Sequence, residues 1–372
     1  LDNENELTSK QTREFYVRSQ VTPLQDVEYI KDTALDFCKK QNLKSAMIKS
    51  IALLQNSSFD EISQVINDSL KLGMDNDEGY DWKRDFEERF KPRFRNPTAT
   101  GWNLIDDTFK GGLGQKELGV VIAPTGAGKS MALVHLGTQA IKEGKTVIHY
   151  TLELQDTVVA SRYDSCLTKI PLESLGSFKE KIYEEILDLD GKLIVKEYPT
   201  KTASTQTIRN HLEKLRMRSI DIDMIIVDYG DLLRPVRYLK EKRNELESIY
   251  EELRAIAAEY ECPVWTASQT NRSGLNAEVI TMESISEAFN KCFVADFIFT
   301  ISRTIEDKIA NSGRMLIAKN RNGPDGLIFP LFMDTSNVCI KVLEPSEMDQ
   351  LVEVSAKKQK ENLVEKYKKF KK

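Results

Sequence analysis

The stretch VIAPTGAGKSMALVHLG, residues 121–137, places two glycines, a lysine and a serine between an apolar run and a second, helix-like apolar run. Backbone N–H groups in such a turn, together with the start of the following helix, form a cradle for phosphate. The turn ends in Gly128, Lys129 and Ser130, which is the ending that a phosphate-binding loop requires. We therefore predict a nucleotide site here, with a simple packing turn as the alternative.

The loop residues have distinct expected tasks. Lys129 would reach the β- and γ-phosphates, and the Ser130 hydroxyl would hold Mg²⁺. The consensus G-x-x-x-x-G-K-[ST] begins with glycine, but Ala123 stands there, and alanine does not tolerate a strongly left-handed backbone. We expect ATP and Mg²⁺ as cofactors, with nucleotide contacts from Pro124, Thr125, Gly126, Ala127, Gly128, Lys129, Ser130 and Met131.

Two carboxylates that follow apolar runs are expected to complete the site. Asp228 comes directly after four apolar residues, where a buried strand would leave the sheet, and this suits a second Mg²⁺ contact. A turn-forming or capping aspartate is the alternative. Glu153 ends the run VIHYTLE and would lie beside the P-loop strand if the two strands are adjacent. A buried glutamate there could orient the attacking water, whereas the alternative is a surface glutamate.

The composition is that of a globular chain. Of 372 residues, 40% are hydrophobic and 30% are charged, and the net charge is −5, so any site for a polyanion must be local. The five cysteines form no CxxC pair and the three histidines are scattered, which favours reduced thiols in the cytoplasm and no zinc site. No apolar run reaches the ~18 residues that a membrane span needs.

Alternating β-rich and helical stretches from 101 to about 345 predict an α/β domain built on a sheet with crossover helices. Ahead of it, apolar residues at spacings of three and four predict a helical hairpin within 25–54, and 58–72 predicts an amphipathic helix whose apolar face needs a partner. We expect four parts, which are a helical N-terminal part at 1–56, a linker with this helix at 57–98, the α/β domain at 99–345, and a basic tail at 346–372.

Four blocks follow one another along the chain: GWNLIDDTFKGGLGQKELGVVIAPTGAGKS, YTLEL with Arg162 nine residues after Glu153, a block running from IIVDYGDLL to LRAIAAEYECPVWTASQTNR, and LIAKNRNGPDG. In this order they resemble the C-terminal motor of the DnaB-type replicative DNA helicases, particularly those of bacteriophages. The resemblance covers about 101–334. It implies a RecA-like P-loop domain with a mostly parallel sheet, preceded by a small helical N-terminal domain and a linker helix that docks on the neighbouring subunit.

The resemblance also implies roles for single residues. Glu153 would be the catalytic base, Arg162 a nucleotide contact, and Gln269 the end of a sensor strand. Lys319 and Arg321 would act in trans on the γ-phosphate held by the next subunit, where an arginine finger is worth roughly 10³–10⁵ in rate. Without the resemblance, two solvated cations at a strand edge are the alternative.

A basic segment, LLRPVRYLKEKRNELE at 232–247, follows the strand that ends at Asp228. The resemblance implies that this loop lines a central channel and binds the phosphates of single-stranded DNA, largely without base readout. A solvated helix start with ion pairs to Glu241 and Glu245 is the alternative. The expected DNA-binding residues are Arg234, Arg237, Lys240, Lys242 and Arg243.

The resemblance, together with these motifs, implies a ring-shaped, homo-hexameric replicative DNA helicase, which in the family's case moves 5′ to 3′ on single-stranded DNA and unwinds the duplex at the fork. The resemblance adds primase and a helicase loader as candidate partners, no membrane, and the cytoplasm, that of the host if a phage encodes the chain. The family's globular N-terminal head is expected to be missing or represented by a short remnant. Two alternatives stay open, a RecA-like strand-exchange ATPase and a nucleotide-gated scaffold that hydrolyses slowly.

Overall fold

The computed structural model describes residues 27–54, 59–71, 81–87, 90, 95–238, 241–270 and 292–344. The chain divides into two compact units between Lys91 and Pro92. The expected basic tail at 346–372 and residues 1–26 of the expected N-terminal part lie outside the described residues. Within the described part of the chain, no helix has both the length and the apolar character to cross a membrane.

Two helices that pack against each other, α2 (Val27–Leu54) and α3 (Phe59–Lys71), are described in the first unit. Because α2 is one continuous helix, the hairpin expected within 25–54 is wrong, and α2 and α3 form the packed pair instead. The segment 27–54 contains neither glycine nor proline, so nothing in it ends a helix. The amphipathic helix α3 therefore has a partner within its own chain.

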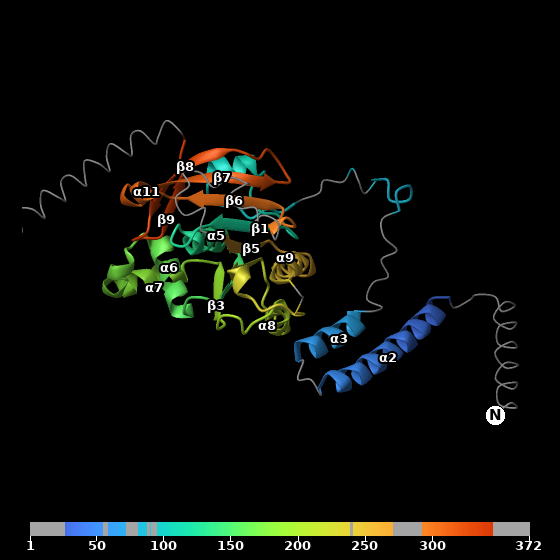
Figure 1. The fold of residues 1–372 in the computed structure, drawn as a ribbon. Helices are drawn as coiled ribbons and strands as arrows, with labels where there is room; N and C mark the ends of the chain where they lie inside the picture. Colours follow the sequence, from blue (N-terminus) through green and yellow to red (C-terminus); the bar gives the residue numbers. More distant parts are fainter. Residues whose placement is uncertain are drawn as a thin grey trace, which may run out of the picture. The chain divides into compact units, whose positions relative to one another are not determined.

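A nine-stranded sheet forms the centre of the second unit, in the order β3-β2-β4-β5-β1-β6-β7-β8-β9 (Figure 1). The six neighbouring strands β3, β2, β4, β5, β1 and β6 pair in parallel. Strands β6, β7, β8 and β9 pair antiparallel. The strands are β1 (Leu118–Ala123), β2 (Thr146–Thr151), β3 (Lys192–Glu197), β4 (Met224–Asp228), β5 (Val264–Gln269), β6 (Phe297–Ser302), β7 (Ser312–Asn320), β8 (Ile328–Asp334) and β9 (Cys339–Val342).

Helices cover both faces of this sheet, which explains why its parallel strands are apolar runs rather than alternating ones. Along β1, Val121 and Ala123 lie in the core shared with α4, α5 and α6, and Val120 and Ile122 lie in the core shared with α8 and α9. The helices of this unit are α4 (Asn103–Thr108), α5 (Lys129–Lys142), α6 (Asp156–Thr168), α7 (Lys179–Leu187), α8 (Thr205–Met217), α9 (Lys242–Glu259) and α11 (Ile305–Ile309), with 3₁₀ turns η2 (Leu172–Phe178) and η3 (Gly230–Leu232).

The condition under which Glu153 would lie beside the P-loop strand, adjacent strands β1 and β2, is not met. Strand β2, which precedes Glu153, is not adjacent to β1, because β4 and β5 lie between them. It pairs instead with β4, where Thr151 is the partner of Asp228 and the Leu152 N–H donates to the Asp228 carbonyl at 2.9 Å. Since parallel strands end at one edge of a sheet, Glu153 still arrives at the edge where the P-loop begins.

Candidate nucleotide site

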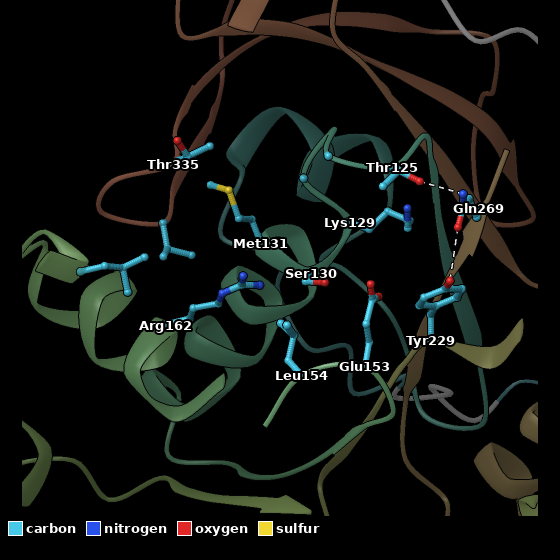
Figure 2. Close-up of a pocket in the computed structure, with 14 residues that line it drawn as sticks. Thr125, Lys129, Ser130, Met131, Glu153, Leu154, Arg162, Tyr229, Gln269 and Thr335 are labelled. Atoms are coloured by element: carbon cyan, nitrogen blue, oxygen red, sulfur yellow. Dashed lines mark hydrogen bonds between the residues drawn. The ribbon is translucent and has the colours of Figure 1, made fainter. Parts of the chain in front are cut away.

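A pocket of about 320 Å³ lies where β1, β2, β4 and β5 end (Figure 2). Figure 2 shows side chains from the P-loop, from the ends of these strands and from α6 pointing into it. The pocket is lined by Thr125, Gly126, Gly128, Lys129, Ser130, Met131, Glu153, Leu154, Arg162, Leu172, Tyr229, Gln269, Thr335 and Val338.

The backbone of the loop requires its two glycines. Gly126 and Gly128 have φ values of +72° and +109°, in the region that favours glycine, and a Cβ on Gly128 would lie 2.4 Å from Met333 Cε. Ala123, in contrast, ends β1 with a buried side chain and does not have a positive φ. The consensus glycine is therefore unnecessary at that position, and the departure from the motif leaves the loop intact.

Lys129 is the first residue of α5 and extends back along the loop. Its Nζ donates to the carbonyl oxygens of Ala123 and Pro124 at 3.1 and 3.2 Å. Burial lowers the pKa of Lys129, an effect that the negative charges of Asp228 and Glu153 oppose. A phosphate in the loop would supply the close negative partner that favours the ammonium form.

Asp228 lies beneath the loop and fits a role as a metal ligand. Its side chain is buried, and burial raises its pKa to about 6, against a hydrogen bond from Ser130 that lowers it. Its Oδ1 atom has no hydrogen-bond partner among the described residues. A buried carboxylate oxygen without a partner, beside a serine hydroxyl, is a donor set suited to Mg²⁺.

Glu153 follows β2 and Gln269 ends β5, and both approach the loop from the same end of the parallel strands. Glu153 is exposed in the open pocket, so the expectation of a buried glutamate is wrong, and Figure 2 shows its carboxylate directed toward the P-loop. The Gln269 Nε2 atom donates to Thr125 Oγ1 at 2.7 Å, and the Tyr229 hydroxyl donates to Gln269 Oε1 at 3.2 Å. These two bonds connect the ends of β4 and β5 to the tip of the P-loop.

The family model described as DnaB-like helicase C terminal domain matches residues 98–337. The chain belongs to this family. The DnaB-like replicative helicase of Enterobacteria phage T4 is 28% identical over 277 residues, which cover 70% of this chain and 58% of that protein. The replicative DNA helicase DnaB of Mycoplasma genitalium is 25% identical over 256 residues, which cover 63% and 54% of the two chains. The chain thus spans little more than half the length of these relatives.

Solved structures agree on the fold. A DnaB-like replicative helicase studied for its interactions with primase matches with a TM-score of 0.64 at 16% identity, over 88% of this chain and 81% of that one. A solved ATPase domain matches with a TM-score of 0.61 at 16% identity, over 72% of this chain and all of the other. The expectation of a RecA-like α/β domain, and of the DnaB family, is confirmed.

Lys319 and Arg321 lie at the opposite end of the parallel strands from the P-loop. Strand β7 runs antiparallel to β6, so its end pairs with the beginning of β6, with Lys319 opposite Ile298. Six residues of β1 separate that end from the P-loop, which is about 20 Å at 3.3 Å per residue. Neither cation lines the pocket. Within one chain, both are therefore out of reach of the candidate nucleotide site.

The expected DNA-binding residues of the DnaB-like domain differ in their surroundings. Arg237 and Arg243 are exposed, whereas Arg234 is half-buried and its backbone N–H donates to the Ala203 carbonyl at 2.8 Å. The side chain of Lys242, the first residue of α9, and the whole of Lys240 lie outside the described residues.

Reasoning from the sequence missed several residues of the DnaB-like pocket. Tyr229 had a usable signal, because it directly follows Asp228 at the strand end. Leu172 comes from η2, and Thr335 and Val338 come from the turn between β8 and β9. No local pattern marks these three, because only the folded chain brings them to the P-loop. Of the expected nucleotide contacts, Pro124 and Ala127 do not line the pocket. The Pro124 carbonyl accepts a hydrogen bond from Lys129 Nζ, and the Ala127 side chain is buried.

The buried charge of Asp228 predicts a stability difference that depends on pH. We expect nucleotide-free, Mg²⁺-free Asp228→Asn protein to exceed the wild type in free energy of unfolding by about 3 kcal/mol at pH 8, because the carboxyl pKa rises from 3.8 to about 6 and each unit is worth about 1.4 kcal/mol. A raised native pKa favours the protonated native state, so wild-type stability is retained below pH 3.8 and lost as the pH rises through 6. The difference should therefore approach zero near pH 4.

Urea unfolding of both proteins from pH 4 to 8 measures this difference. Asp188→Asn, which changes an exposed aspartate that follows α7, is the matched control and should follow the wild type throughout. A difference between Asp228→Asn and wild type that stays constant across this range would contradict the assignment of a raised pKa.

Proposed function

We propose that this chain is the motor of an ATP-dependent, ring-shaped DNA helicase that moves along single-stranded DNA and unwinds the duplex at the replication fork. The observation that carries the proposal is that the side chains needed for ATP hydrolysis are divided between the two opposite ends of the strands in one sheet. Lys129, Ser130, Glu153 and Asp228 meet at one end, and Arg321 lies at the other. A complete site then needs two subunits.

In this proposal the P-loop binds the phosphates of ATP, and Ser130 and Asp228 hold Mg²⁺, which supplies positive charge to the transferred phosphoryl group. Glu153 accepts a proton from the attacking water. Gln269, whose amide nitrogen already faces the loop at Thr125, turns toward the γ-phosphate. Lys319 and Arg321 of the next subunit neutralise the charge that develops in the transition state.

Head-to-tail assembly is supported by the same geometry, because Arg321 and the pocket with Glu153 lie at opposite ends of the sheet, so that identical subunits would meet through unlike surfaces. We propose six subunits from the likeness to the DnaB family. Large apolar side chains on α2 also support assembly, since Phe37, Ile48 and Ile51 are each more than 60% exposed. We further propose 5′ to 3′ movement, a primase and a helicase loader as partners, and activity in the cytoplasm. The primase is supported by the structural likeness to a DnaB-like helicase that interacts with primase.

Strand displacement on forked DNA tests the function. With ATP and Mg²⁺, we expect displacement when the fork carries a free 5′ tail and a duplexed 3′ arm, and no displacement in the reverse arrangement. Lys129→Ala protein is the negative control, since it loses the contact to the phosphates. Pairing of homologous strands without displacement would instead support a strand-exchange protein, and slow hydrolysis without either would support a scaffold.

The exposed cations after β4 predict how DNA binding depends on salt. We expect Arg237→Ala with Arg243→Ala to weaken binding to single-stranded DNA and to reduce the slope of log affinity against log salt by about 1.4, since each phosphate contact contributes about 0.7. ATP hydrolysis without DNA should persist, and its stimulation by DNA should fall. Fluorescence anisotropy across a salt series measures the slope.

A matched control replaces Arg216 and Arg218, two exposed cations at the C-terminal end of α8, with alanine. The segment after β4 lies at the other end of that helix, where Arg234 pairs with Ser204. This control loses the same charge and should keep the wild-type slope. An equal loss of slope in both double variants would mean that net charge, rather than this loop, determines the binding.

A further inference from the structure

Asp296, at the start of β6, binds two arginines through one carboxylate. Its side chain is only 6% exposed. Its Oδ1 atom accepts from Arg321 Nη1 at 2.8 Å and from Arg254 Nη2 at 2.9 Å, and its Oδ2 atom accepts from Arg254 Nε at 3.2 Å and from the Leu118 N–H at 3.0 Å. Every one of these bonds runs to a cation or to the backbone of the P-loop strand.

The backbone reinforces this arrangement. The Arg321 N–H donates to the Asp296 carbonyl at 3.0 Å, and the Asp296 N–H donates to the Leu118 carbonyl at 2.8 Å. Arg321 is thereby attached to Asp296 by its main chain and by its guanidinium together. Because β1 and β6 are buried, paired strands, this attachment fixes Arg321 to the rigid centre of the sheet.

The guanidinium of Arg321 still has donors to offer. Its side chain is 45% exposed, and among the described residues the carboxylate of Asp296 takes only Nη1 of a group that carries five N–H donors. A carboxylate that holds one end of the planar fork determines the direction in which the other end points. The remaining donors match the oxygens of a phosphate.

Arg254, on α9, supplies the second positive charge. It uses Nε and Nη2 on the same carboxylate that binds Arg321, so two guanidinium charges meet one carboxylate charge. Lys319 lies nearby, since Arg321 and Arg254 are among the charges that contribute, after burial, to lowering its pKa. The cluster of Arg321, Arg254 and Lys319 around one aspartate carries a surplus of positive charge, which suits an anionic ligand.

We propose that Asp296 is the positioning residue of Arg321, with Arg254 as the cation that balances its charge, so that the Arg321 guanidinium is presented in one direction to the nucleotide of the next subunit. This inference rests on the proposed action of Arg321 in trans. We assign Asp296 no contact with the nucleotide, because its side chain is only 6% exposed and both of its carboxylate oxygens already accept hydrogen bonds within the chain.

Mixed rings separate a positioning role from a structural one. Subunits with Lys129→Ala bind no ATP productively and only donate Arg321, and subunits with Arg321→Ala donate nothing and only supply the nucleotide site. Hydrolysis in the mixture then comes from one kind of interface. We expect Asp296→Asn in the donating subunits to lower the kcat of the mixture about 10²-fold, with little change in KM. A catalytic group that is displaced by about 1 Å can cost that factor in rate.

The same Asp296→Asn change in the site-supplying subunits should leave the mixture unaffected, because those subunits donate no cation. Arg254→Gln in the donating subunits should act in the same direction as Asp296→Asn. Its matched control is Arg209→Gln, which removes an arginine that pairs with Glu252 and Glu259 of the same helix α9. The control should keep the activity of the mixture.

The possible results point to different conclusions. A mixture of Lys129→Ala and Arg321→Ala subunits that stays inactive, although native mass spectrometry shows that they assemble together, would contradict action in trans and the proposed function with it. An active mixture that Asp296→Asn impairs equally from either subunit, or does not impair at all, would overturn the positioning role alone.

Discussion

Rings of the Arg321→Ala variant are expected to hydrolyse ATP roughly 10³–10⁵-fold more slowly than the wild type while binding ATP with nearly unchanged affinity. The guanidinium would compensate charge that develops as the γ-phosphoryl group is transferred, so its loss affects the transition state more than the bound ATP. The P-loop of the same subunit should be intact, because Arg321 lies across the sheet from it. Phosphate release and equilibrium binding of a fluorescent ATP analogue measure the two quantities.

Arg216→Ala is the matched control for this variant, since its side chain is 52% exposed against 45% for Arg321 and it lies on α8. It should hydrolyse ATP at the wild-type rate. If Arg321→Ala lost ATP affinity in proportion to its rate, Arg321 would be acting on the bound nucleotide or on folding, and the finger assignment would be wrong.

Glu153→Gln is expected to reduce hydrolysis by about 10²–10⁴-fold, the usual contribution of a general base, while ATP and Mg²⁺ still bind. Glutamine preserves the shape of the side chain but does not accept the proton of the attacking water. Lys129, Ser130 and Asp228, which would bind the phosphates and the metal, are unchanged. Single-turnover hydrolysis with prebound ATP isolates the chemical step.

Glu197→Gln offers a close control, because Glu197 ends β3, the strand next to β2, at the same edge of the sheet but does not line the pocket. It should turn over ATP normally. Near wild-type turnover in Glu153→Gln would move the base to another residue.

The strands were predictable because a strand that is buried on both faces of the sheet is apolar at consecutive positions. Runs such as LGVVIA and MIIVD contain apolar residues at consecutive positions, and both are buried throughout. The order of the strands cannot be derived from apolar runs, which is why Glu153 was placed beside the P-loop strand only on the condition that β1 and β2 are adjacent. That order depends on where each crossover helix returns the chain, and hydrophobic periodicity records only which faces are apolar. The separate helix α3 was predicted close to where it lies, whereas the break expected inside 25–54 was wrong, because apolar spacings of three and four do not mark where a helix ends.

The candidate site was predictable where one short segment carries several of its groups. Gly126, Gly128 and Lys129 form a motif because one turn must supply backbone donors and a cation together. Asp296 is the opposite case. It precedes an apolar strand as many aspartates do, and its meaning depends on Arg254 and Arg321, which lie 42 and 25 residues away in the chain.

The distance between Lys129 and Arg321 determines how many complete ATP sites an assembly of a given number of chains contains. If each site is made at a junction, an open row of n subunits contains n − 1 complete sites, and closure of the row adds the last one without adding a subunit. Hydrolysis per chain would then fall on dilution as junctions come apart, even though every separated chain keeps an intact P-loop and its capacity to bind ATP.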